Sequence, residues 1–251
     1  MATSESYTPG HSQNATDFML KRSVQTHGQF FLPYLSPGVS VLDCGCGPGS
    51  MSLSIASLVA PGNVVGVDFG ASQIESAMSA AIQAGVQNAA FRTADVYALP
   101  FENATFDRVF SHALLEHLSD PQRAVGEMFR VLKPGGYIGV CSPDWGGFVL
   151  SPPSAALTQA IDAYTTLQTR NGGDVYAGRK LGVHLQTAGF DDVQMAARYE
   201  CYPSLAFIGE YLALQLEGAG EVTSATTLRE WSHAEGGMFA QCWVSCTARK
   251  G

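Results

Sequence analysis

The sequence predicts an α/β protein built on a doubly wound parallel sheet, and three observations support this. Short apolar runs alternate with amphipathic segments between Val39 and Cys141. Runs such as Val64–Asp68 are continuously apolar, which is typical of strands that helices cover on both faces. Hydrophobic residues make up 46% of the 251-residue chain, enough for a sizeable core. We therefore expect residues 1–251 to form one α/β domain with right-handed crossovers.

Each element of this core follows from a local pattern. Apolar runs bounded by Gly, Pro or Asp predict strands at Val39–Asp43, Val64–Asp68, Ala90–Thr93, Phe106–Phe110 and Tyr137–Cys141. Apolar residues at helical spacing predict the intervening helices Met51–Val59, Ala71–Ala84 and Pro121–Leu132. Residues 11–35 carry apolar positions consistent with one or two further helices.

The pattern changes after residue 142, where "SPDWGGFVLSPPS" reads as a loop. Further helices are predicted at 155–170 and 176–188 and within 204–235, and strands at 193–202 and 238–248. Residues 143–175 and 203–236 therefore form two insertions. We expect these insertions to cap a site on the core at 36–142, with residues 1–35 as a helical lid.

Charge and composition exclude several classes of protein. The formal net charge is −8, and the 14 Lys and Arg residues are scattered, so no basic face for nucleic acid is evident. We expect Lys21 and Arg22 to lie on the solvated face of a helix. No apolar run approaches the ~20 residues that span a bilayer, and the polar N-terminus does not resemble a secretory signal. We expect a cytoplasmic protein.

The six cysteines fit a reducing compartment. Their spacings include no CxxC pair, and Cys44-x-Cys46 is too tight for the usual zinc half-site. We expect free thiols and no metal site.

Chemistry-bearing residues follow the predicted strands, where open parallel sheets bind ligands. "VLDCGCGPGS", at 41–50, has glycines spaced G-x-G-x-G, not the G-x-G-x-x-G of dinucleotide-binding loops. Asp43 would repel a pyrophosphate but suits an amine. Asp68, after the second strand, suits a ribose, and Asp95, after the third, suits an exocyclic amine. An amino acid joined to adenosine, as in S-adenosylmethionine (SAM), meets these demands.

Five successive motifs carry a resemblance to a known family: "VLDCGCGPG", "VVGVDFG", "RTADVYALPF", "FDRVFSHALLEHLSDP" and "RVLKPGGYIGV". In this order, over roughly residues 30–142, they resemble the class I SAM-dependent methyltransferases. The type 11 group, related to the quinone C-methyltransferases, is the most similar. The resemblance implies a Rossmann-like sheet of seven strands whose last strand is antiparallel.

The resemblance also assigns residues to the cofactor. Asp43, Gly45 and Gly47 should surround its methionine portion, Asp68 its ribose, and Phe69 its adenine. The implied cofactor-binding residues are Asp43, Gly45, Cys46, Gly47, Asp68, Phe69, Ala94, Asp95, Val96, Ser111 and His112.

The predicted function is methyl transfer of the EC 2.1.1 type, from SAM to a small, partly apolar metabolite, with S-adenosylhomocysteine as product. His112 is the best-placed candidate for a general base, whereas His117 reads as a structural residue. Candidate substrate contacts are Tyr7, His11, Asp144, Trp145, Glu210, Tyr211 and His233.

Two alternatives remain open. A SAM-binding protein of the same fold could catalyse a rearrangement or act as a regulator without methyl transfer. An NAD-dependent oxidoreductase fits less well because of the glycine spacing and Asp43. The sequence leaves open whether the chain is a monomer or a homodimer.

Overall fold

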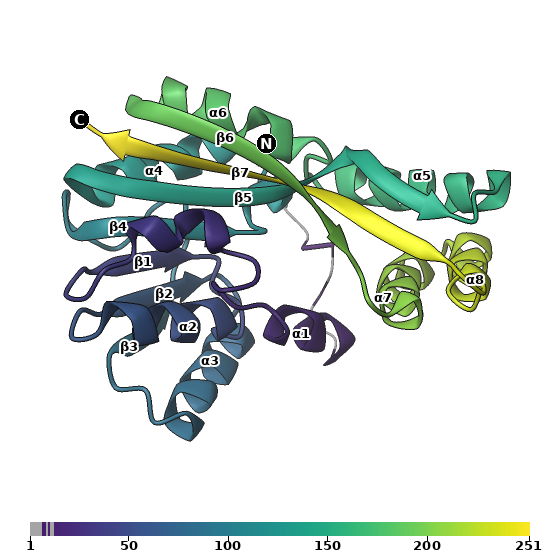
Figure 1. Ribbon diagram of the computed structural model, residues 1–251, viewed down its shortest axis with the longest axis horizontal. Helices are drawn as coiled ribbons and strands as arrows, with labels where there is room; N and C mark the ends of the chain where they lie inside the picture. Colours follow the sequence, from purple (N-terminus) through teal and green to yellow (C-terminus); the bar gives the residue numbers. More distant parts are fainter. Residues whose placement is uncertain (1–6, 9, 11–12) are drawn as a thin grey trace.

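The computed structural model describes residues 7–8, 10 and 13–251, and its centre is a seven-stranded sheet flanked by helices (Figure 1). The strand order is β3-β2-β1-β4-β5-β7-β6. Strands β1 to β5 pair in parallel, whereas β7 runs antiparallel to both β5 and β6. The predicted fold, a Rossmann-like sheet with an antiparallel last strand, is confirmed.

The bounds of the elements are as follows. The strands are β1 (Val41–Cys44), β2 (Val64–Asp68), β3 (Ala89–Thr93), β4 (Phe106–His112), β5 (Leu132–Ser151), β6 (Phe190–Cys201) and β7 (Met238–Lys250). The α-helices are α1 (Gln13–Leu20), α2 (Ser50–Val59), α3 (Ala71–Gln83), α4 (Pro121–Val131), α5 (Ala155–Arg170), α6 (Ala177–Thr187), α7 (Leu205–Gly218) and α8 (Val222–Trp231). Two short 3-10 helices are η1 (Gln29–Tyr34) and η2 (Leu115–His117).

Local sequence explains where several helices begin. The side chains of Asp120, Ser154 and Ser204 each accept a hydrogen bond from the backbone amide three residues further on, capping α4, α5 and α7. Pro121 occupies the first turn of α4, where its missing N–H leaves no bond unmade. From β1 to α4, the predicted elements agree with the structure to within two residues at each end.

Strand β5 differs from the prediction, which ended it at Cys141 and placed a loop beyond. The strand continues to Ser151 because β7 runs beside it and supplies hydrogen-bond partners. Its Gly- and Pro-rich segment forms an irregularity in the ladder between Asp144 and Phe148. Glycines and a proline, which indicated a loop, here mark the bulge in a long strand.

The outer ends of β5 and β7 extend beyond the rest of the sheet and meet α5, α7 and α8 (Figure 1). We call these helices and strand ends the cap. A hydrophobic cluster within it includes Trp145, Ile161, Leu212 and Phe239 and is separate from the clusters that pack on the two faces of the sheet. Among the described helices, none has both the length and the apolarity needed to cross a bilayer.

The contact between β5 and η1 yields a test of the packing. A Cβ atom at Gly139 would overlap the buried ring of Phe31. We expect Gly139→Ala to lower the free energy of unfolding by about 1–3 kcal/mol, because overpacking displaces the ring or the strand. Urea denaturation measures the change. Gly126→Ala is the matched control, since Gly126 lies in α4 with open space around it and should be neutral or stabilising. Equal stability of the two variants would contradict the packing.

Candidate functional site

A cavity of about 660 Å³ lies at the carboxyl edge of the parallel strands. Its walls come from the loops after β1, β2, β3 and β4 and from residues at the end of α1. Of the predicted cofactor residues, those that line it are Asp43, Gly45, Cys46, Gly47, Asp68, Phe69, Ala94, Asp95, Val96 and His112.

The glycine loop keeps its shape through Asp68. The backbone amides of Gly47 and Gly70 donate to the two carboxylate oxygens of Asp68, each at 2.9 Å. Gly47 and Gly49 have φ angles of 51° and 84°, a region that favours glycine. A Cβ atom at Gly49 would also lie 2.9 Å from the Cβ of Ala77 in α3. Loop and carboxylate therefore form one rigid wall of the cavity.

Asp43 is a buried carboxyl on the same wall. It lies in β1 and accepts a hydrogen bond from the hydroxyl of Ser52 in α2. Burial raises its pKa to about 7, and the nearby charge of Asp68 adds to the effect. No ion pair among the described residues involves Asp43. A cationic ligand group at this point would lie beside a carboxyl group that has no other ion-pair partner among the described residues.

The loop cysteines are not set up for metal binding. Burial raises the thiol pKa values of Cys44 and Cys46, which keeps both thiols protonated at neutral pH. No cluster of three or more His, Cys, Asp or Glu side chains suited to a metal ion occurs in the described part of the chain.

The far end of the cavity offers a flat surface and an acceptor. The side chain of Phe69 is 82% exposed and borders the cavity, so a planar ring has room to lie against it. Asp95 accepts a hydrogen bond from the amide of Tyr97 at 2.8 Å, which fixes the turn after β3. This end suits an aromatic group that carries an amine.

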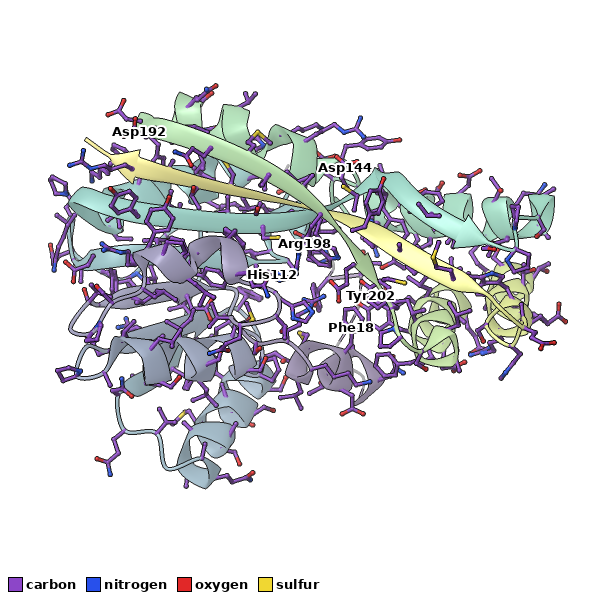
Figure 2. The ribbon with its side chains drawn as sticks, viewed as in Figure 1. Phe18, His112, Asp144, Asp192, Arg198 and Tyr202 are labelled. Carbon is purple, nitrogen blue, oxygen red and sulfur yellow. The ribbon has the colours of Figure 1, made fainter. Side chains whose placement is uncertain are left out.

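His112 lies at the end of β4, near the centre of the molecule (Figure 2). Its ring stacks on Trp243, with a centroid distance of 4.9 Å. Both ring nitrogens are buried and have no hydrogen-bond partner among the described residues. Burial and the charge of Arg22 hold its pKa well below the usual value, so the ring is neutral near pH 7.

A smaller chamber of about 60 Å³ lies between the cap and the sheet. Its walls are rich in aromatic residues, among them Phe18, Trp145, Tyr164 and Tyr211. We call it the aromatic chamber. Figure 2 shows Phe18 beside Tyr202, where α1 meets the outer end of β6; their rings stack at 5.9 Å. The residues shared with the larger cavity are Tyr7, Met19, Arg22, Ala113 and His117.

Some predicted residues lie in these walls and others do not. Tyr7 lines both cavities, and Trp145 and Tyr211 line the aromatic chamber. Ser111 lines neither, because its hydroxyl donates to the carbonyl of Cys44.

Within the described part of the chain, the charged residues predicted as substrate contacts lie outside both cavities. Asp144 accepts two hydrogen bonds from the guanidinium of Arg179, each 2.7 Å, and lines neither cavity (Figure 2). Glu210 pairs with Arg229 across α7 and α8 at 2.7 Å. His233 is exposed just after α8. His11 lies outside the described residues.

Three wall residues were not identified from the sequence. Arg22 is half-buried and lines both cavities, so its assignment to a solvated helix face was wrong. Glu116 and His117 lie in η2, soon after β4; Glu116 is buried and lines the aromatic chamber, and His117 is half-buried and lines both cavities. Their position after a parallel strand was an available signal, because the neighbouring strand ends had already been selected on that ground.

The fold and the cavity together define a class I SAM-dependent methyltransferase. Residues 35–193 match the family described as "Methyltransferase domain", and the chain therefore belongs to this family. The class predicted from the sequence motifs is confirmed.

Individual relatives agree with this assignment. The chain is 29% identical to the O-methyltransferase resE of Aspergillus sclerotiorum over 209 residues, which cover 79% of this chain and 75% of that one. It is 36% identical to an uncharacterised methyltransferase of Schizosaccharomyces pombe over 123 residues, 47% of this chain. That match spans less than half of the relative, 44%.

A solved structure shares the fold. A methyltransferase-like protein from Bacillus halodurans superposes with a TM-score of 0.67 at 18% identity, covering 90% of this chain and 99% of that one.

The raised pKa of Asp43 predicts how stability varies with pH. Because the folded chain holds this proton more tightly than the unfolded chain does, the free energy of unfolding should fall as pH rises from about 4 to about 7. Asp43→Asn keeps an acceptor for Ser52 and should flatten part of this slope and stabilise the protein at pH 8. Thermal unfolding over this pH range measures both effects. An unchanged slope, or a less stable variant at pH 8, would contradict the assignment; the exposed Asp162→Asn is the control.

Proposed function

We propose that this chain transfers a methyl group from SAM to a small, partly apolar molecule, a reaction of the EC 2.1.1 type. One observation carries the proposal: Asp43, Asp68 and Asp95 line a single cavity, and they lie at the ends of the neighbouring strands β1, β2 and β3. Their order across the sheet matches the order of the ammonium, ribose and adenine groups in SAM. Membership of the methyltransferase domain family supports the same conclusion.

The residues present fit this cofactor. The buried carboxyl of Asp43 has no cationic partner among the described residues, and an ammonium group would supply one. Each oxygen of Asp68 accepts one amide and retains a lone pair for a ribose hydroxyl. Phe69 and Asp95 would hold the adenine by contact with its face and with its amine.

When bound, SAM supplies a methyl group on a positively charged sulfur. The part of the chain lining the cavity holds the reactants in alignment and excludes water, and such positioning is a major source of rate enhancement. His112 contributes a neutral polar ring at this point. Its depressed pKa makes it a weak base, so we propose a positioning role for it.

The acceptor is proposed to lie where the larger cavity meets the aromatic chamber. Of the residues predicted as substrate contacts, Tyr7 lines both cavities, and Trp145 and Tyr211 line the aromatic chamber. The division into a lid at 1–35, a core at 36–142 and cap insertions at 143–175 and 203–236 stays a prediction. The mostly apolar walls favour a small molecule over a protein or RNA acceptor.

Cofactor binding is tested by calorimetry with SAM. We expect the wild-type chain to bind SAM and Asp68→Ala to bind at least tenfold more weakly, because the substitution removes the ribose acceptor and releases the glycine loop. Asp162→Ala, an exposed change on α5, should bind SAM as the wild type does. Absence of binding by the wild type would overturn the proposed function, whereas an unchanged affinity of Asp68→Ala would overturn only the ribose assignment.

A further inference from the structure

The aromatic chamber contains one carboxyl group that the cofactor does not require. Glu116, in η2, is 2% exposed and lines the chamber. Its Oε2 accepts a hydrogen bond from the hydroxyl of Ser142 at 2.8 Å. Its Oε1 lies 3.8 Å from Nε2 of His117, which is beyond hydrogen-bond distance. A carboxyl group thus borders a space whose walls are rich in aromatic side chains.

The chamber also contains a cation. The guanidinium of Arg22 lies 4.7 Å from the ring centroid of Phe18 and 5.1 Å from that of Trp243. Among the described residues, no carboxylate forms an ion pair with Arg22. Arg22 is therefore held by two aromatic faces while its charge faces the space that it shares with the larger cavity.

The charges of Glu116 and Arg22 restrict the chemical class of the acceptor. A carboxylate has no proton for Glu116 to remove, and it would repel Glu116 whenever Glu116 is charged. An ammonium would meet the charge of Arg22, which already covers two of the aromatic faces. A neutral hydroxyl that gives up its proton meets neither obstacle, since Glu116 takes the proton and Arg22 faces the resulting oxygen anion.

The size and walls of the chamber restrict the acceptor further. About 60 Å³ is less than a whole aromatic ring needs, so only the hydroxyl-bearing edge of the acceptor would enter the chamber, and its remainder would lie in the larger cavity. The rings of Trp145, Tyr164 and Phe239 border the chamber. Flat groups make the largest contact with such rings.

We propose that the acceptor is a flat molecule with an acidic hydroxyl, a phenol or an enol, bound with its oxygen facing Glu116 and Arg22. The inference rests on the proposed function and names its substrate class. The carboxylate of Glu116 removes the hydroxyl proton, and an oxygen lone pair forms the bond to the methyl carbon. The electron pair of the broken carbon–sulfur bond stays on sulfur. The products are a methyl ether, S-adenosylhomocysteine and protonated Glu116, which returns its proton to water.

Protonation equilibria in the chamber are consistent with this role. Burial raises the pKa of Glu116 to about 7, partly offset by Ser142 and Arg22. Burial lowers the pKa of His117 to about 3 and raises that of Tyr211 to about 12. It also raises the pKa values of the other groups that interact with Glu116, namely Tyr7, Tyr164 and Cys141. Among these groups, Glu116 alone changes its charge near neutral pH.

The first experiment needs no turnover and uses 4-nitrophenol, whose phenolate absorbs visible light whereas the neutral phenol does not. The chain is saturated with S-adenosylhomocysteine and titrated with 4-nitrophenol, or with 4-nitroanisole, which has no hydroxyl proton. We expect the phenol to bind at least tenfold more tightly than the anisole. Burial raises the pKa values of the Tyr7 and Tyr211 phenols, whereas the charge of Arg22 acts in the opposite direction. Because the ligand oxygen is proposed to face Arg22 directly, bound phenol should show the phenolate band at a lower pH than free phenol does. Equal binding of the two probes, or a bound phenol that stays neutral, would overturn the substrate class.

Variants separate the roles of the two charges. Arg22→Met should lose the phenolate band while it still binds S-adenosylhomocysteine. A variant that instead loses S-adenosylhomocysteine would assign Arg22 to the cofactor and overturn the proposal. Glu116→Gln should retain the band, because Arg22 remains. Arg170→Met and Glu75→Gln, at exposed positions, are the matched controls and should behave as the wild type does.

Turnover of 4-nitrophenol with SAM then tests Glu116 as the base. We expect Glu116→Gln to lower kcat by about 100-fold or more and to abolish the rise of kcat/KM with pH near neutrality. A phenol that binds but is not methylated by the wild type, or an unchanged pH profile in the variant, would overturn the role of Glu116. If SAM itself does not bind, the proposed function fails first, and calorimetry distinguishes that case.

Discussion

The hydrogen bonds from Gly47 and Gly70 to Asp68 are the interaction on which the rest of the site depends. They join the loops after two neighbouring strands and leave backbone and carboxylate facing one cavity. Glycines at positive φ make the loop geometry accessible, and the packing of α3 leaves no space for a Cβ atom at Gly49. Without this connection, the position of the loop would not be fixed relative to Asp43, and the two carboxyl groups would not face the same ligand.

The two cavities differ in their electrostatics. In the larger one, carboxyl groups line the wall, and the buried Asp43 has a pKa raised to about 7 because burial disfavours its charge. In the aromatic chamber a cation and a carboxyl group face the same space. A positively charged donor and an acceptor that becomes an anion would therefore meet at the junction, each drawn by charges of the chain. This arrangement brings opposite charges together on the reacting atoms without placing either one in bulk water.

The sequence predicted the core because its signals are local there. Apolar runs and helical periodicity located the elements from β1 to α4, and the rule for strand ends selected Asp43, Asp68 and Asp95. The cap could not be predicted in the same way, since its residues take their orientation from distant partners. Glu210 faces Arg229, and Asp144 turns to Arg179, because each charge pairs with a cation far along the chain. Arg22 was misassigned because aromatic rings from α1 and β7 surround it only after folding.

The length of β5 and β7 has a consequence for how this chain could diversify. The same two strands lie between β4 and β6 in the sheet and form the floor of the cap, so backbone hydrogen bonds run without a linker from one to the other. The cap is thereby held at a fixed distance from the edge of the sheet where the cofactor is proposed to bind. The helices of the cap are joined to these strands only by loops. Substitutions on the inner faces of α5 and α7 would reshape the acceptor space and leave the donor geometry intact. A lineage could thus exchange one acceptor for another without rebuilding the half of the site that binds the methyl donor.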